Sequence, residues 1–229
     1  MKGGLKMPLT IAIDGPVGAG KSTISDVVAQ RLGILHLDTG AMYRAVGLYM
    51  LDNQIDLNDQ ETVSALCETG KVLVDVRYES GLQRTMINDQ DVTGRIRAQE
   101  VGQAASRVSR YPAVRKMLVR RQQEMAKSQS MLLDGRDIGT VVLPNATVKI
   151  YLTASPESRA RRRMLQLREK GDQTPFEDIL SEVNARDYQD MHRETDPLRQ
   201  AEDAVLLDSS SMSFEETVSA ILKLVEAKK

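Results

Sequence analysis

The chain alternates short apolar runs with longer stretches in which apolar positions recur every three to four residues. Residues 9–14 form an apolar run bounded by the turn-forming pair Gly15-Pro16, which is typical of a buried strand. A helical pattern follows over 21–32 and is stopped by Gly33. Strands alternating with helical sequence indicate an α/β fold with a parallel sheet covered on both faces. Further strands are predicted over 34–37, 131–134, 148–153 and 204–208, and a further helix over 41–51.

One segment, about 71–92, breaks this rhythm. Apolar and polar residues alternate over 71–78, a second extended run covers 82–87, and a turn at 79–81 separates them. This pattern predicts a small antiparallel meander inserted into the α/β core. The composition leaves two interpretations open, a decoration or a lobe that covers a substrate.

The composition narrows the class of protein. The 229 residues are 41% hydrophobic, enough for one globular domain with insertions. Aromatic residues make up only 3% and the net charge is −1, which disfavours a surface for nucleic acid. Of the 31 basic residues 20 are arginines, whose planar fork suits small phosphate or carboxylate ligands.

The remaining composition predicts a cytoplasmic protein without a membrane partner. A single cysteine fits a reducing compartment, no apolar stretch approaches the length of a membrane span, and the first residues lack the run of a signal peptide. The two histidines exclude a histidine-rich metal site. We expect His36 and Cys67 to be packed residues without a catalytic role.

A phosphate-binding loop is the strongest motif, because it stands between a predicted strand and a predicted helix. Its glycines let backbone N–H groups point at phosphate oxygens, and the following helix adds its positive end. Lys21 suits the β- and γ-phosphates, and the Ser22 hydroxyl suits Mg²⁺. The loop predicts a nucleoside triphosphate site formed by Gly15, Pro16, Val17, Gly18, Ala19, Gly20, Lys21, Ser22 and Thr23.

A second cluster follows the strand over 34–37. Thr39 is predicted to cap the next helix, and Tyr43 and Arg44 lie one turn further, where they could reach an anion. The alternative interpretation is that Arg44 is a solvated helix charge.

A third cluster, 134–140, follows the predicted strand over 131–134. Ligands of open parallel sheets bind at the carboxyl ends of strands. Asp134 therefore resembles the carboxylate that organises Mg²⁺ and water in phosphate-loop enzymes, and Arg136 is placed to fork a phosphate. An ordinary Asp-Gly turn is the alternative.

Two more helices carry charged residues. Ser155-Pro156 begins a helix on which Arg159, Arg162 and Arg163 share one face, either as a solvated basic surface or as a lid over a triphosphate.

The segment 174–177 is predicted to be a capping box that opens the next helix. The apolar stripe of that helix continues into charged residues, which favours a face turned toward a polar ligand over a helix that leaves the body. The apolar members are Phe176, Ile179, Leu180 and Val183, and the charged members are Arg186, Asp190 and Arg193.

These motifs resemble those of the bacterial cytidylate kinases, within the nucleoside-monophosphate kinase family. The resemblance covers nearly the whole chain; the phosphate loop is widely shared, whereas the run 134–140 combined with the meander is more specific. It is carried by the segments 13–23, 38–44, 134–140, 157–164, 185–187 and 203–205. One departure is Thr39, where some relatives have serine; both supply a hydroxyl.

The family implies a phosphate-loop kinase with a five-stranded parallel sheet flanked by helices, an enlarged monophosphate-binding lobe and an arginine lid. On that basis the core comprises 1–40, 111–155 and 191–229. The lobe comprises 41–110, with its insert at about 71–93, and the lid with its adjoining helix comprises 156–190.

The family also implies roles for single residues. Arg44 and Arg136 would hold the acceptor phosphate, with Tyr43 nearby. Arg159 and Arg163 would belong to the lid. The cytosine edge would be read by Ser106, Arg115, Asp137 and Arg193, while Arg186 and Asp190 would take the ribose and the transfer site.

The expected activity is transfer of the γ-phosphoryl group of ATP, with Mg²⁺, to CMP and dCMP for pyrimidine nucleotide synthesis and salvage. A monophosphate already presents an anionic oxygen, so no general base is required. The expected partners are these nucleotides alone, with no nucleic acid, for a monomeric enzyme. Alternatives are a kinase for UMP, AMP or a metabolite alcohol, a nucleotide-controlled switch, and a nucleic-acid-binding module.

Overall fold

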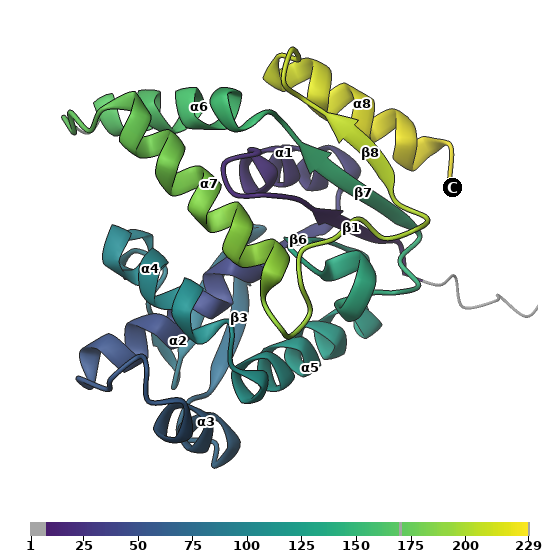
Figure 1. Ribbon diagram of the computed structural model, residues 1–229. Coiled ribbons are helices and arrows are strands. Elements are labelled where there is room, and N and C mark those ends of the chain that lie inside the picture. Colours follow the sequence, from purple (N-terminus) through teal and green to yellow (C-terminus); the bar gives the residue numbers. More distant parts are fainter. Residues whose placement is uncertain (1–7, 170, 229) are drawn as a thin grey trace, which may run out of the picture. The chain divides into compact units, whose positions relative to one another are not determined.

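The computed structural model describes residues 8–169 and 171–228 and confirms the α/β fold with a five-stranded parallel sheet flanked by helices (Figure 1). The strands lie in the order β2-β6-β1-β7-β8. Every predicted strand of this sheet is present, with ends shifted by at most one residue. The bounds are Thr10–Asp14 for β1, Leu35–Asp38 for β2, Met131–Gly135 for β6, Val148–Thr153 for β7 and Val205–Asp208 for β8.

By its contacts the chain divides into two compact units. One consists of Leu35–Met131 with the segment that ends at Leu9. The other consists of Thr10–Ile34 and the chain from Leu132 onward. We call the unit that contains Leu35–Met131 the lobe unit, and the unit that contains Thr10–Ile34 the loop unit.

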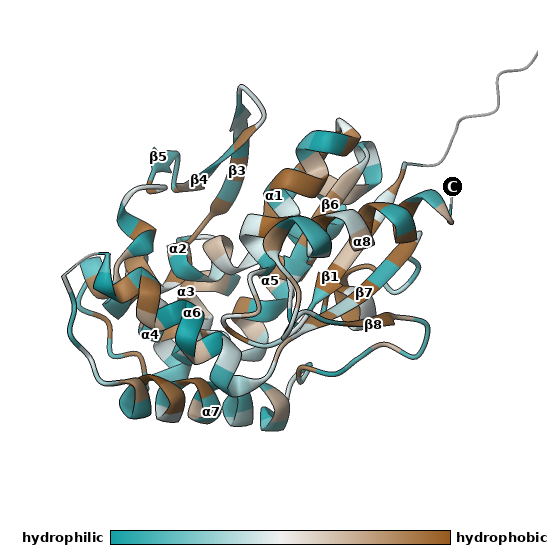
Figure 2. Cartoon of the chain, turned by 90° about the horizontal axis from the view of Figure 1, so that it is seen from above, coloured by the Kyte–Doolittle hydropathy of each residue, from teal (hydrophilic) through white to brown (hydrophobic). Residues whose placement is uncertain are grey.

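The loop unit contains β1, β7, β8 and all of β6 except its first residue, Met131. In it β1 lies parallel beside β7, and β7 lies parallel beside β8. The side chains Ile11, Ile13 and Leu152 are fully buried, and in Figure 2 strands β1 and β7 are largely coloured as hydrophobic. Helix α1 (Lys21–Leu32) has the predicted bounds and packs against α8 (Phe214–Glu226). It ends at Gly33, whose φ of 65° is a left-handed conformation that favours glycine.

Helices α6 (Pro156–Arg168) and α7 (Phe176–His192) pack against each other in the same unit. Their shared core contains Ala160, Ile179 and Val183, which confirms the predicted apolar stripe. The short π-helix η2 (Ile138–Val142) follows β6. Among the described helices none is long and apolar enough to cross a bilayer.

The capping box predicted at 174–177 is wrong. Helix α7 begins after Pro175, which offers no side-chain cap. The backbone N–H and hydroxyl of Thr174 both donate to Asp172 Oδ1, at 2.8 and 2.6 Å. Thr174 is therefore part of a turn with Asp172, and its hydroxyl does not cap α7.

The lobe unit contains the predicted antiparallel meander, with strands β3 (Val74–Glu79), β4 (Leu82–Ile87) and β5 (Gln90–Asp91). Its helices pack in pairs, α2 against α4 and α3 against α5. A Cβ on Gly47 of α2 would lie 2.8 Å from the Ala105 N atom of α4, so only glycine permits this approach. The bounds are Thr39–Asp52 for α2, Gln60–Glu68 for α3, Arg95–Arg97 for the 3-10 helix η1, Gln99–Val108 for α4 and Pro112–Ser128 for α5.

His36 and Cys67 are buried, as predicted. Burial raises the pKa of the Cys67 thiol to about 11, so it is protonated at neutral pH.

Candidate active site

The phosphate loop joins β1 to α1 in the predicted setting. A Cβ on Gly15 would lie 1.9 Å from the Leu152 carbonyl oxygen, so this position requires glycine. Lys21 Nζ donates to the carbonyl oxygens of Gly15 and Pro16, both at 2.8 Å. These two hydrogen bonds connect the end of the loop to its beginning. They hold the ammonium group of Lys21 beside the loop, where a phosphate would bind.

The charge of Lys21 is held in a buried position. Burial lowers the pKa of its ammonium group to about 7, and Arg136 acts in the same direction, while Asp134, Asp190 and Asp14 oppose the change. A bound polyanion would favour the charged form. We therefore expect the pKa of Lys21 to rise when a triphosphate occupies the loop.

Ser22 and Asp134 meet beside the loop. The Ser22 hydroxyl donates to Asp134 Oδ2 at 2.8 Å, and Asp134 is buried at the carboxyl end of β6. Such hard oxygen donors suit Mg²⁺, which keeps several waters and phosphate oxygens as its other ligands. Within residues 8–169 and 171–228 no three His, Cys, Asp or Glu side chains cluster as a metal cage. The donors present fit a magnesium ion bound together with a phosphate.

Asp14 ties the loop strand to the segment after β6. Its carboxylate accepts the backbone N–H groups of Ile138 and Gly139, each at 2.7 Å. Burial raises the pKa of Asp14 to about 6, although these two hydrogen bonds lower it. Sequence reasoning missed this residue; the available signal was a carboxylate closing an apolar strand directly before Gly15.

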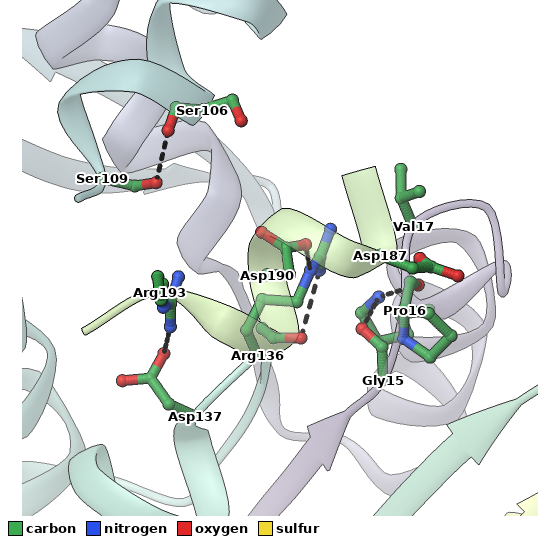
Figure 3. A network of polar contacts seen from close by, with 12 residues as sticks. Gly15, Pro16, Val17, Ser106, Ser109, Arg136, Asp137, Asp187, Asp190 and Arg193 are labelled. Atoms are coloured by element: carbon green, nitrogen blue, oxygen red, sulfur yellow. Dashed lines mark hydrogen bonds and ion pairs between the residues drawn. The ribbon is translucent and has the colours of Figure 1, made fainter. Parts of the chain in front are cut away.

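Two ion pairs bring α7 to the 134–140 segment (Figure 3). Arg136 Nε donates to Asp190 Oδ2 at 2.8 Å, and Arg193 lies 3.3 Å from Asp137 Oδ1. Asp190, Asp137 and Arg193 are nearly fully buried. Arg186 lies on α7 one turn before Asp190. Asp190 and Arg193, two members of the charged continuation of the α7 stripe, therefore pair with charged groups of the same unit, and a polar ligand for this face stays a prediction.

The first turns of α6 contact the phosphate loop. Arg159 is 3% exposed; it donates to the Val17 carbonyl at 2.8 Å and binds the Asp187 carboxylate at two points. Arg162 donates to the Ser209 carbonyl at 2.6 Å. Asp187 is a second residue that sequence reasoning gave no role, since only the fold shows that it faces Arg159. Arg163 lies one turn beyond Arg159 on the same helix.

In the lobe unit the predicted cap of α2 is wrong. The N-cap residue is Asp38, whose side chain accepts the Ala41 N–H at 3.0 Å, and Thr39 is the buried first residue of the helix. The carboxylate is already at the end of β2 with an extended backbone, which is the conformation that a cap needs.

Four more residues with predicted roles lie in the lobe unit. The Arg115 guanidinium stands over the Tyr43 ring, 5.6 Å from its centroid, and only 2% of Arg115 is exposed. Arg44 donates to the Ile96 carbonyl at 3.1 Å. On α4, the Ser106 carbonyl accepts the Ser109 hydroxyl at 3.0 Å (Figure 3).

Comparison with known proteins shows the family of the chain. The sequence profile of the family described as cytidylate kinase matches residues 11–227. The chain belongs to the cytidylate kinase family. This membership makes it a kinase with ATP as its phosphate donor. The other acceptors considered, UMP, AMP and a metabolite alcohol, are not favoured.

Individual cytidylate kinases cover almost the whole chain. One from Caldicellulosiruptor bescii is 48% identical over 216 residues, which are 94% of this chain and 95% of that protein. One from Thermosipho melanesiensis is 46% identical over 222 residues, or 97% and 99%. A crystal structure of an uncharacterized protein from Eubacterium ventriosum aligns with a TM-score of 0.53 at 10% identity, covering 96% of this chain and 99% of that one, and this likeness concerns the fold alone.

Proposed function

We propose that this member of the cytidylate kinase family transfers the γ-phosphoryl group of ATP to CMP and dCMP, giving ADP and CDP or dCDP. The observation that carries the proposal is the linkage of the phosphate loop, through Asp14, to the segment that bears Arg136 and Asp137. A donor site and an acceptor-binding segment are thereby held at one edge of the sheet, where ligands of α/β proteins bind.

The donor side is assigned to residues 15–23. Their backbone N–H groups and Lys21 would bind the β- and γ-phosphates, and Ser22 with Asp134 would hold Mg²⁺. The ion neutralises charge on the phosphate oxygens when bound. Lys21 then follows the migrating phosphoryl group, and its position between the Gly15 and Pro16 carbonyls keeps it at the loop.

The acceptor side is assigned to charged residues of both units. Arg44 and Arg136 would hold the phosphate of the acceptor with Thr39 and Tyr43 nearby, and Arg186 and Asp190 would take the ribose and the transfer site. The cytosine edge is assigned to Ser106, Arg115, Asp137 and Arg193. The anionic acceptor oxygen needs no general base, so the arginines have only to neutralise charge and align the two nucleotides.

A lid over the triphosphate is assigned to 156–190, with Arg159 and Arg163 as its arginines, and the monophosphate-binding lobe to 41–110. The contacts of Arg159 and Arg162 near the phosphate loop support this placement of α6. Closure would exclude water, which otherwise competes as the acceptor. A cytoplasmic location and a monomeric state stay predictions.

Base selection tests the assignment of the acceptor side. The 4-amino group of cytosine can donate a hydrogen bond to the Asp137 carboxylate, whereas uracil has a carbonyl oxygen at this position, which can only accept. Removing a buried partner costs about 1–3 kcal/mol per unpaired group. We therefore expect Asp137→Ala to harm CMP more than UMP and to narrow the gap in kcat/KM between them. Arg136→Ala, the matched control, should weaken all acceptors alike because it holds the shared phosphate. If Asp137→Ala lowered both acceptors by equal factors, Asp137 would be a structural residue.

A further inference from the structure

Strand β2 stands at one end of the strand order, so among the strands of the described residues only β6 adjoins it and its other edge has no neighbour. The backbone groups of alternate residues in a strand point to the same edge. Leu35 uses its N–H toward the Ser130 carbonyl at 3.4 Å, so His36 and Asp38 point the opposite way. An edge of this kind leaves N–H and C=O groups that need other partners.

Two side chains of the meander supply these partners. The Tyr78 hydroxyl donates to the His36 carbonyl at 2.9 Å. Gln83 Oε1 accepts the Asp38 N–H at 2.8 Å, and Gln83 Nε2 donates to the Asp38 carbonyl at 3.3 Å. A single amide side chain thus pairs with both backbone groups of one residue, as a neighbouring strand would.

The Gln83 amide is itself held in place. Its Nε2 also donates to Thr85 Oγ1 at 3.2 Å, and Thr85 is 1% exposed. The Thr85 N–H in turn donates to the Thr93 hydroxyl at 2.9 Å. The position of the amide is therefore set by the buried part of the meander.

Gln83 binds the backbone of Asp38, which lies at the junction between β2 and α2. Asp38 is the N-cap of α2, and its carboxylate holds the first turn through the Ala41 N–H. Fixing both backbone groups of Asp38 sets the start of the helix that carries Tyr43 and Arg44. The Gln83 side chain thus fixes both the edge of β2 and the first turn of α2.

We infer that the meander is a positioning element for the acceptor site and that Gln83 is its positioning residue. The inference rests on the proposed function, which assigns Thr39, Tyr43 and Arg44 to the acceptor. The meander then has a functional role. It affects substrate binding by fixing the N-terminus of α2 and does not have to contact the substrate.

The test compares Gln83→Met, which keeps the length of the side chain and removes the amide, with Arg84→Met. Arg84 is the next residue of β4 and pairs with Glu79 inside the meander, which makes it a matched control. For Gln83→Met we expect KM for CMP to rise about tenfold, the equivalent of about 1.4 kcal/mol. KM for ATP and kcat should change by less than about twofold, since the phosphate loop belongs to the other unit. Arg84→Met should leave all three unchanged.

Amide hydrogen exchange provides a readout that does not depend on turnover. The Asp38 N–H should be protected in the wild-type protein and exchange faster in Gln83→Met, because its acceptor is lost. Tyr78→Phe, which removes only the bond to His36, should raise KM for CMP by a smaller factor and serves if Gln83→Met fails to fold.

Equal KM values for CMP in Gln83→Met and Arg84→Met would overturn the inference. A Gln83→Met variant with a lower Tm, a lower kcat and equally raised KM values for CMP and ATP would overturn it as well. An unprotected Asp38 amide in the wild-type protein would overturn it too. Failure of the proposed function looks different, since the wild-type protein itself would then not phosphorylate CMP.

Discussion

At the scale of single residues, Lys21 combines a structural and a chemical role. It bonds two carbonyl groups of the loop, and burial lowers its pKa to about 7. We expect Lys21→Ala to keep the fold and to lower kcat by about two to three orders of magnitude, the usual loss when a preorganised charge is removed. Steady-state assays give kcat, and circular dichroism with a Tm checks the fold. Near-normal turnover by a folded variant would remove Lys21 from the mechanism.

Asp14 provides a prediction about pH. Its pKa is about 6 in the folded chain against an ordinary value of 3.8, so the folded chain binds this proton more tightly than the unfolded chain does. Its stabilising contribution is therefore full below about pH 4 and is lost as the pH rises through 6. We expect the difference in unfolding free energy, wild type minus Asp14→Asn, to fall by up to about 3 kcal/mol between pH 4 and pH 7.

Urea unfolding of both proteins at several pH values measures this difference. The comparison cancels the titrating groups that do not interact with Asp14. The charges of Lys21 and Asp137 do interact with it, so the pH range from 4 to 6, below the Lys21 pKa of about 7, is the most informative part of the comparison. A difference that grows with pH, or that does not depend on it, would mean that Asp14 is not the buried group described here.

At the scale of elements, α6 is the helix whose motion the proposed function requires. Arg159 and Arg162 anchor its first turns near the phosphate loop, while Leu165 near its other end is 61% exposed. We expect hydrogen exchange over 155–169 to slow when a bisubstrate analogue binds, because closure protects these amides. Exchange in α8 is the internal control and should not change. Equal exchange in α6 with and without the analogue would indicate a static basic surface instead of a lid.

The elements themselves were largely predictable because their signals are local. The bounds of α1 follow from the loop motif before it and from Gly33 after it, and β7 follows from its apolar run. Both errors in capping involve a carboxylate near the threonine that the pattern favours. Asp38 is itself the cap of α2, whereas Asp172 accepts the N–H and hydroxyl of Thr174 and leaves α7 without a side-chain cap. The pattern alone does not show which of these local hydrogen bonds forms.

At the scale of the whole molecule, the phosphate loop could be predicted from the sequence, because all of its parts are adjacent in the chain. The partners of the arginines could not. Arg136 meets Asp190 and Arg159 meets Asp187 only after α6, α7 and β6 have packed, and nothing in the spacing of these residues specifies the pairs. The same holds for Gln83 in β4 and Asp38 at the end of β2, which come together only when these two strands have packed.

The acceptor preference of the wild-type protein tests the central claim most directly. ATP consumption would be measured at saturating ATP with equal concentrations of CMP, dCMP, UMP, AMP and GMP, and without an acceptor. We predict efficient turnover with CMP and dCMP, kcat/KM for UMP lower by a factor of about ten or more, and negligible turnover with the purine monophosphates or without an acceptor. Preference for UMP or AMP over CMP, or ATP consumption that does not depend on the acceptor, would contradict the account.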